Sequence, residues 1–172
     1  MAWDARSAGG NVTVLADGWV EIRGAGTVLD SAGVAAGSAA WEFEVAQTGR
    51  GSWVGFVQVG ASGADALLDL NLSLGALGWA IWGGETGAIH PMYARGAQSD
   101  QILGFRAGSR PALALRCGAG AGGAGGSIEY AIDDRIVGQA FGDLPALPPG
   151  GAWRLAASNG WAGTTRVRAR RL

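Results

Sequence analysis

Short runs in which apolar residues alternate with other residues recur along the chain, and glycine or proline separates one run from the next. In AAWEFEVA (39–46) the apolar residues would share one face of an extended strand, with the acids on the opposite face. The apolar members are Trp41, Phe43 and Val45, and the acids are Glu42 and Glu44. Alternation with a period of two is typical of a β-strand that is buried on one side.

Further runs of this kind lie at 12–23, 52–60, 77–84, 110–118, 126–141, 152–158 and 164–172. The run at 52–60 starts with apolar residues on both faces, which predicts burial on both sides there. No stretch shows the 3.6-residue period of an amphipathic helix of usual length. Many short strands with turn residues between them predict an all-β domain, either a two-layer sandwich or a barrel.

Two of these runs contain hairpin turns. In 12–23 the turn falls at Asp17-Gly18, among the strongest short hairpin signals. In GSIEYAIDDRIVGQAF (126–141) two extended halves meet at Asp133-Asp134. Aspartate tolerates the left-handed backbone that a tight hairpin requires, so we interpret this acidic pair as a turn and not as a catalytic or metal-binding pair.

The length of 172 residues suits one domain with a substantial core. We expect a single domain over 1–172, with its core at about 12–172 and a flexible glycine-rich loop at 118–126. That loop, GAGAGGAGG, lacks the Lys-Ser/Thr ending of a phosphate-binding loop. Most of the eight tryptophans lie inside strand-like runs, which predicts that their rings pack in the core.

Charge and composition argue against several classes of protein. The formal net charge of −1 gives no electrostatic basis for binding nucleic acid. No apolar run is long enough to span a membrane, and the first residues, MAWDARSAGG, lack the apolar core of a signal peptide. Cys117 is the single cysteine, so no disulfide framework can form, and a reducing, cytoplasmic location is expected.

The order of four motifs resembles the SPRY domain family. The motifs are AAWEFEVAQTGRGSWVGFVQVG, then LGWAIWGG with His90 shortly after, then GSIEYAIDDRIVGQAFGDLP, then WRLAASNGWAG. The resemblance runs from about Leu15 to the C-terminus. It implies a concanavalin A-like jelly roll, which is a two-layer antiparallel β-sandwich, and a protein- or peptide-binding role in which loops select the partner.

The sequence departs from this family at four places. A Gly-Asp pair is usual before the late hairpin, and here the stretch is 108–111, Gly-Ser-Arg-Pro. The usual Asn-Gly turn is Asp133-Asp134, and glycines lengthen the connection before Ser127. Ile89 stands where an aromatic residue often precedes the loop histidine. Since some members present that ring to ligand peptides, their specificity does not transfer to this chain.

Glu42 and Glu44 lie two residues apart and therefore project from the same sheet face. Two carboxylates about 5.5 Å apart suit a retaining glycoside hydrolase. No third acid follows on the same strand, and we expect no enzymatic activity. An alternative function is a carbohydrate-binding, lectin-like sandwich, which would need exposed aromatic rings beside such acids.

Three oxygen-bearing residues, Asp65, Asp69 and Asn71, crowd one leucine-rich segment, and oxygen ligands of this kind can bind calcium. Their spacing fits no defined calcium loop, and the interleaved leucines favour a lid packed over an apolar surface. His90 and Cys117 are each the only residue of their kind, and nothing nearby marks either as activated for nucleophilic catalysis. We expect neither a metal nor a cofactor.

Near the C-terminus, Arg166, Arg168 and Arg170 alternate with smaller residues, which places three guanidinium groups on one strand face. Arg171 extends the patch. Two interpretations stay open: a solvated face whose charge deters edge-to-edge aggregation, and a docking patch for an acidic protein surface.

The preferred function is a non-enzymatic protein-protein interaction module, or a small accessory subunit of a larger multi-subunit assembly. A purely architectural subunit without a free ligand is a further alternative. We expect binding through loops at one end of the sandwich: 61–76, 83–95 and 159–161. The candidate contact residues are Trp161, Tyr93, Arg95, Asn159 and Trp82. Glycine flanks Trp161 on a loop, which favours an exposed anchor, with a core ring as the alternative.

Overall fold

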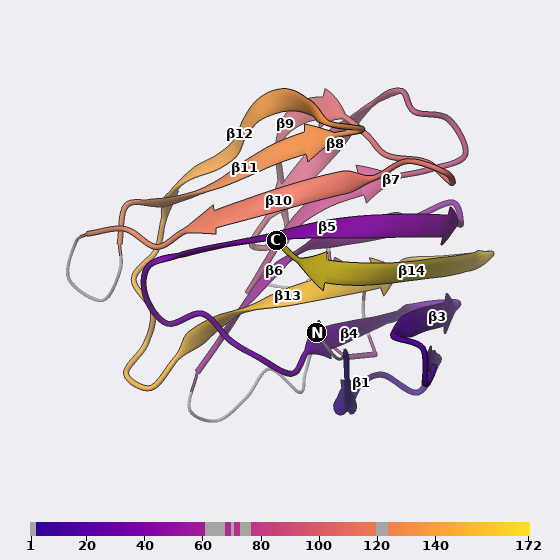
Figure 1. Cartoon of the computed structure of the whole chain (residues 1–172), viewed down its shortest axis with the longest axis horizontal. Helices are drawn as coiled ribbons and strands as arrows, with labels where there is room; N and C mark the ends of the chain where they lie inside the picture. Colours follow the sequence, from indigo (N-terminus) through magenta and orange to yellow (C-terminus); the bar gives the residue numbers. More distant parts are fainter. Residues whose placement is uncertain (1–2, 61–67, 70, 73–76, 120–123) are drawn as a thin grey trace.

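Among the residues that the structure describes, fourteen β-strands form two sheets of seven antiparallel strands each. The structure is a computed structural model, and it describes residues 3–60, 68–69, 71–72, 77–119 and 124–172. In Figure 1 the strands of one sheet cross the front of the molecule, with the other sheet behind them. Over the described residues there is no helix of the length and apolar character needed to cross a membrane.

The strands are listed here in their spatial order. Sheet A contains β1 (Trp3–Ala8), β4 (Gly26–Asp30), β13 (Ala152–Asn159), β6 (Ser52–Val59), β7 (Gly78–Gly83), β8 (Ile89–Ala94) and β9 (Ala97–Leu103). Sheet B contains β12 (Arg135–Leu144), β11 (Gly126–Ile132), β10 (Pro111–Arg116), β5 (Ser38–Gln47), β14 (Thr164–Arg171), β3 (Trp19–Arg23) and β2 (Val12–Val14). The expected two-layer, all-β sandwich is confirmed.

The main core lies between the two sheets. The three apolar residues of the β5 alternation, Trp41, Phe43 and Val45, are all buried in it. The edge of the Trp41 ring packs on Phe56 from the opposite sheet, with ring centroids 5.3 Å apart. Burial of such rings is the main favourable contribution to folding, at about 25 cal/mol per Å² of apolar surface.

Strand β6 is buried on both faces, as its sequence predicts. Val54 and Phe56 belong to the main core, whereas Trp53 and Val57 belong to a second apolar cluster on the outer face of sheet A. Leu72 is fully buried in this second cluster, and Leu68 packs against it. The leucines at these two positions therefore cover an apolar surface, as the lid interpretation predicts.

The acidic pair at 133–134 forms the hairpin turn between β11 and β12. Asp133 and Asp134 both have positive φ, at 50° and 64°, which the tight two-residue hairpin turn requires. The Asp133 carboxylate accepts a hydrogen bond from the Arg110 main-chain N–H at 2.8 Å, and Asp134 pairs with the Arg110 guanidinium at 2.6 Å. The pair is thus engaged in holding the turn against the start of β10.

Three parts of the sheets lie outside the strands expected from the sequence: β1, β4 and the β8–β9 hairpin. Trp3 in β1 is buried in the main core, so the core includes residues N-terminal to its expected start at about residue 12. Of the glycine-rich connection at 118–126, residues 120–123 lie outside the described residues.

Candidate functional site

An aromatic cluster occupies the outer face of sheet A, on the side away from sheet B. Trp53 of β6 stacks on Trp82 of β7, with ring centroids 5.4 Å apart and planes inclined by 20°. The Tyr93 ring of β8 meets Trp53 edge-on at 5.1 Å, and His90 lies 4.6 Å from Trp82. The predicted residues Trp82 and Tyr93 are therefore brought together, through Trp53 and beside His90. Trp82, Tyr93 and His90 are half-buried.

Trp161 lies on the turn between β13 and β14, and 57% of its surface is exposed. The six-membered part of its ring lies against Gly51, where an added Cβ would come within 2.6 Å of Trp161 Cε3. Its neighbour Gly160 donates its N–H to the Gly51 carbonyl at 2.7 Å. The ring is thus exposed on one side and supported by a glycine backbone on the other.

Asn159 is fully buried directly beneath this turn. Its side-chain Nδ2 faces three main-chain carbonyl oxygens, those of Gly24 at 2.9 Å, Trp161 at 3.3 Å and Gly163 at 3.4 Å. Its Oδ1 accepts the Thr165 hydroxyl hydrogen at 2.8 Å. The structure therefore gives Asn159 a positioning role toward Trp161, because the buried amide is not available to touch a partner.

Three connections meet at this end of the sandwich: the β5–β6 turn at 48–51, the β7–β8 loop at 84–88, and the β13–β14 turn at 160–163. The Thr48 hydroxyl donates to the Gly84 carbonyl at 3.0 Å, and Arg50 N–H donates to the Ala162 carbonyl at 3.3 Å. We call this surface, together with Trp82, the tryptophan end. The tryptophan end contains parts of two of the three loop regions that the sequence predicts to bind a partner, 83–95 and 159–161.

Arg95 lies at the opposite end of sheet A. It is an exposed turn residue between β8 and β9, with φ of 55°, and its N–H donates to the Gly78 carbonyl at 2.7 Å. Gly78 pairs with Val57 near the end of β6, whereas the tryptophan end adjoins Ser52 at its start. Arg95 is therefore not part of the surface that carries Trp161. Most of the expected 61–76 loop lies outside the described residues.

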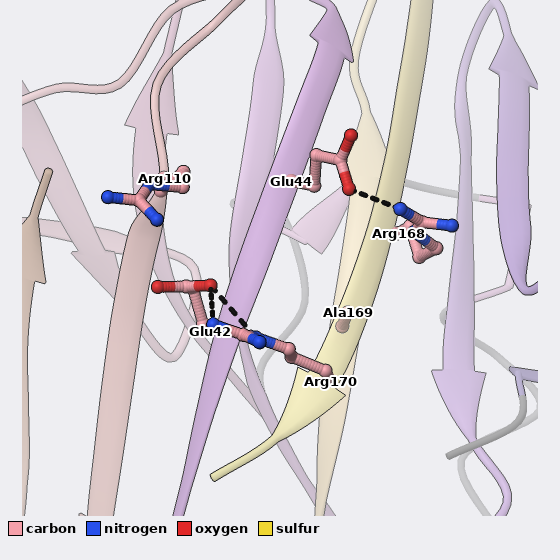
Figure 2. A pocket seen from close by; sticks show the side chains of 6 residues that line it. All are labelled: Glu42, Glu44, Arg110, Arg168, Ala169 and Arg170. Carbon is pink, nitrogen blue, oxygen red and sulfur yellow. Dashed lines mark hydrogen bonds and ion pairs between the residues drawn. The ribbon is translucent and has the colours of Figure 1, made fainter.

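The two acids of β5 are engaged with arginines of the neighbouring strand β14, as Figure 2 shows. Glu44 pairs with Arg168 at 2.5 Å and Glu42 pairs with Arg170 at 2.8 Å, and each pair is directly opposite in the strand register. The Glu44–Arg168 pair is exposed on both sides and contributes little stability, whereas in the second pair only Arg170 is exposed and the Glu42 side chain is mostly buried. The acids face guanidinium groups and not a sugar-sized aromatic platform, so no observation favours the lectin-like alternative.

The C-terminal arginines also cover tryptophan rings of sheet B. Arg166 and Arg168 lie over the Trp19 ring, with their guanidinium carbons 5.3 Å and 5.0 Å from its centroid. Arg171 lies 5.5 Å from the Trp41 ring centroid. Stacking of this kind buries the apolar part of arginine and shields the ring from water. This arrangement supports the solvated-face interpretation of the arginine patch.

The residues considered for metal or nucleophilic chemistry lie apart. Asp69 accepts the Gly10 N–H at 3.0 Å, and Asp65 lies outside the described residues. His90 is in sheet A, whereas Cys117 follows β10 of sheet B. Burial raises the pKa of the Cys117 thiol, which favours the unreactive protonated form. Among the described residues, no three His, Cys, Asp or Glu side chains form a metal-binding group.

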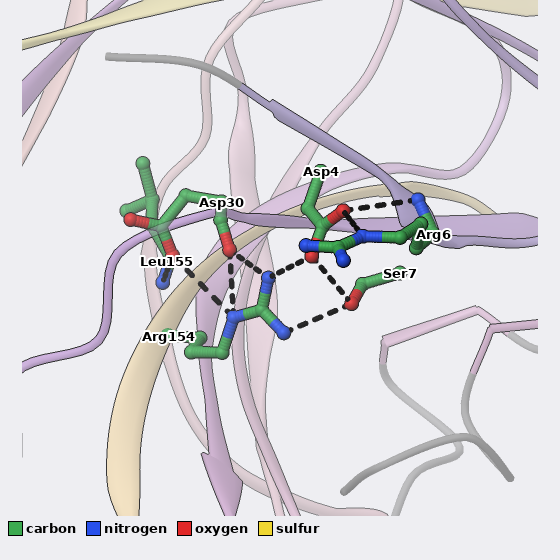
Figure 3. A network of polar contacts seen from close by, with 6 residues as sticks. All are labelled: Asp4, Arg6, Ser7, Asp30, Arg154 and Leu155. Atoms are coloured by element: carbon green, nitrogen blue, oxygen red, sulfur yellow. Dashed lines mark hydrogen bonds and ion pairs between the residues drawn. The ribbon is translucent and has the colours of Figure 1, made fainter.

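A buried acid, Asp30, fastens β1 to the sandwich through Arg154 (Figure 3). The Arg154 guanidinium donates to the Asp30 main-chain carbonyl, to the Ser7 hydroxyl at 2.9 Å and to the Asp4 carboxylate at 3.3 Å. The Asp30 carboxylate accepts the Leu155 N–H at 2.9 Å. Burial raises the pKa of Asp30 to about 6, although the charge of Arg154 and main-chain N–H groups act in the opposite direction.

This raised pKa predicts an unusual pH dependence of stability. Between pH 3.8 and about 6 the folded state binds a proton at Asp30 that the unfolded state releases, so unfolding becomes easier as pH rises through this window. The effect should be on the order of 2–3 kcal/mol. Urea unfolding of the parent and of Asp30→Asn at pH 4 and pH 6.5 measures it. Between pH 4 and pH 6.5 the free energy of unfolding of the parent should fall by this amount relative to that of Asp30→Asn. Equal changes in both proteins would contradict the raised pKa of Asp30.

No family model matches the sequence, and comparison with curated proteins finds no match. Solved structures do match in fold. The SPRY domain of human HERC1 superposes with a TM-score of 0.74 at 18% identity, covering 98% of this chain and 96% of that one. The TRIM65 PSpry domain gives 0.66 at 11% identity, with coverage of 98% and 88%. The stonustoxin structure gives 0.62 at 12% identity, covering 98% of this chain and 26% of that one. The fold of this chain is thus the SPRY-type β-sandwich.

Proposed function

We propose that residues 1–172 act as one SPRY-type domain whose function is to bind a peptide segment of a partner protein at the tryptophan end. The observation that carries this proposal is the 57% exposure of Trp161 on a backbone that buried hydrogen bonds hold in place. A partner that covers a ring of this size removes a large apolar area from water, which favours association. The module is proposed to be non-enzymatic.

The way in which Trp161 is held favours tight binding. An anchor that is already fixed loses little conformational freedom on association, so more of its contact energy appears as affinity. Tryptophan is also among the residues that dominate binding energy at protein interfaces. Because Asn159 fixes the turn from inside, the ring has a stable base on which a peptide can pack.

Trp82 adds a half-buried ring to the same surface, stacked on the buried ring of Trp53. The exposed part of this ring offers a bound peptide further apolar contact area. His90 lies against Trp82 and Tyr93 lies against Trp53, and both would limit which side chains fit beside the stacked rings.

The proposed partner is a protein, and a larger multi-subunit assembly in a reducing, cytoplasmic setting is the proposed context. The charge balance of the chain gives no reason to expect nucleic acid.

A purely architectural subunit would elute only within its assembly when native extract is fractionated by size. A free pool of the chain in that fractionation would support a binding module.

Substitution of Trp161 by alanine tests the proposal. Parent and variant chains are immobilised, exposed to native extract, and compared by quantitative mass spectrometry. We expect the captured partner to fall at least tenfold with Trp161→Ala, since truncation of an anchor residue typically costs 2 kcal/mol or more, that is, roughly 30-fold in affinity.

Leu77→Ala is the matched control, because Leu77 is also an exposed apolar side chain but lies at the other end of sheet A. It should leave capture unchanged. Urea unfolding confirms that both variants fold. Capture that survives Trp161→Ala at the parent level would overturn the proposed site.

A further inference from the structure

The two sheets have four edge strands, and β12 differs from the other three. Edge strands carry unpaired main-chain N–H and C=O groups that can pair with another chain, and proteins usually blunt them. β2 is only three residues long, and β1 presents charged Asp4 and Arg6. The first five residues of β9 are exposed, and the run includes Gln98, Ser99 and Asp100. β12 has ten residues and is the longest of the four.

The first half of β12 carries apolar side chains that the sandwich leaves uncovered. Ile136 is 82% exposed, the highest value among the exposed large apolar side chains of the described residues. Val137 beside it is half-buried. Gly138 follows with φ of 138°, where the pairing of β12 with β11 becomes irregular. The irregularity lies on the side of β12 that pairs with β11, and a bulge of this type bends the strand and increases its local twist.

A groove lies between the bent β12 and β9, the edge strand of the other sheet. It has a volume of about 580 Å³. Its apolar lining comes from both sheets and consists of Ile89, Met92, Ile102, Leu103, Ile136 and Val137. Ile89 is 66% exposed. The groove is therefore an opening into the space between the sheets, flanked by one free strand edge on each side.

A second, shallower apolar surface continues from this groove over the outer face of sheet B. It is lined by the outward-facing alanines 40, 112, 114 and 131, with Ile136 and Leu172 beside them, and the exposed acid Glu129 also borders it. Ile136 borders both surfaces. Three of the five exposed large apolar side chains of the described residues, Ile89, Ile136 and Leu172, lie along this band. Contiguous exposed apolar surface of this kind marks an interaction site.

Two charged side chains line the groove without an ion-pair partner in the described part of the chain. Arg135 begins β12, and Asp100 lies on β9. The Asp100 carboxylate accepts only the N–H of the next residue, Gln101, at 2.8 Å. Most other arginines of sheet B are paired or stacked, as at Arg110, Arg168 and Arg170. The groove thus offers one positive and one negative group beside its apolar floor.

We propose that the β12 edge is a second docking surface, where an extended segment of a partner protein adds as an eighth strand to sheet B. A strand placed there turns alternate side chains toward the groove, and the other set points outward and continues the outer face of sheet B beyond Ile136. The segment should therefore be apolar at alternate positions facing the groove. It should also carry an acid to pair with Arg135 and a base to pair with Asp100. This surface does not depend on Trp161.

The occupant is tested with a displayed library of random twelve-residue peptides selected on the full chain. Enriched peptides are synthesised, and their affinity is measured for the parent, Ile136→Glu, Leu77→Glu and Trp161→Ala. We expect peptides with apolar residues at alternate positions whose affinity falls at least tenfold with Ile136→Glu. Affinity for the other two variants should stay within twofold. Leu77→Glu is the matched control because it also introduces a charge at an exposed apolar position.

Amide hydrogen exchange distinguishes strand addition from other binding modes. A peptide that adds as a strand should slow exchange along Arg135–Ala140, and N-methylation of alternate peptide amides should abolish binding. Arg135→Glu should weaken peptides that carry an acid and strengthen peptides that carry a base.

Three results would overturn the proposal. One is that no selected peptide depends on Ile136. Another is that the bound peptide leaves the amides of β12 unprotected. The third is that sedimentation shows a dimer of the parent chain that Ile136→Glu converts to monomer, because the occupant would then be a second copy of this chain.

Discussion

Replacing Asn159 with aspartate should lower the free energy of unfolding by about 3 kcal/mol. The substitution keeps the shape of the side chain and exchanges its Nδ2 donor for an anionic oxygen. That oxygen would face the carbonyl oxygens of Gly24, Trp161 and Gly163 within a fully buried site. Urea unfolding at pH 7 measures the change. Because the cost comes from the buried charge, part of the lost stability should return at low pH, where the new carboxyl is protonated.

Asn11→Asp is the control for this experiment. The Asn11 side chain also donates to a main-chain carbonyl, that of Ala25 at 2.7 Å, but Asn11 is exposed. Water can solvate the new carboxylate there, so the loss should stay near 0.5 kcal/mol. Equal losses at the two positions would mean that the Asn159 network does not hold the Trp161 turn. Partner capture by Asn159→Asp should also fall, since Trp161 would lose its fixed base.

Replacing Gly55 with alanine should lower the free energy of unfolding by roughly 3–5 kcal/mol. Gly55 lies in the middle of β6, between β13 and β7, and pairs with Ala80. A Cβ at this position would lie 1.9 Å from the Trp79 carbonyl oxygen and 3.0 Å from the Ala80 Cα. Both atoms are main chain, so they cannot move aside without separating two central strands of sheet A. The midpoint of thermal unfolding reports the effect.

Gly10→Ala serves as the comparison. At Gly10 the nearest atom to an added Cβ is an Asp69 carboxylate oxygen, 3.9 Å away. Stability there should change by at most about 0.5 kcal/mol. If Gly55→Ala were as mild as Gly10→Ala, β6 and β7 would have to be less closely packed than the structure shows. A Gly55→Ala chain that does not fold at all agrees with the prediction.

The strands that could be predicted are those whose two faces differ. In β5, β10 and β14 a buried position recurs at about every second residue, and the sequence shows the same period because apolar side chains occupy those positions. The turn at Asp133-Asp134 was also predictable, because few residues adopt positive φ twice in succession. The order of these elements, together with their turn residues, was enough to indicate the sandwich.

The strands that escaped prediction lack that contrast. β4, Gly26–Asp30, is buried at all five positions, so it shows no alternation. β9 has the opposite character, since its first five residues are all exposed. β4 pairs with β13, which is distant in the sequence, and with β1, and such pairing is a property of the tertiary structure that leaves little local trace. β9 pairs with its neighbour β8 in a hairpin, but its exposed first five residues show no alternation of buried and exposed positions.

The candidate site was only partly predictable for a similar reason. Trp161 could be selected because glycines flank it, and its exposure agrees with that choice. Nothing local indicates that Asn159 points inward, since its shortest hydrogen bond to a carbonyl is to Gly24 in the β3–β4 turn, far away in the sequence. Arg95 and Trp82 belong to the same stretch of sequence, yet β8 runs the full length of the sheet and carries Arg95 to the other end.

The uneven burial of the eight tryptophans has an optical consequence. Five of the rings are buried, those of residues 3, 41, 53, 79 and 153, whereas Trp161 is 57% exposed. Trp19 and Trp82 lie between these extremes. A soluble quencher such as iodide should therefore remove mainly the fluorescence of Trp161 and leave that of the buried rings. The proposed binding surface thus carries its own reporter, because any occupant that covers Trp161 would shield it from the quencher and shift its emission toward that of a buried indole.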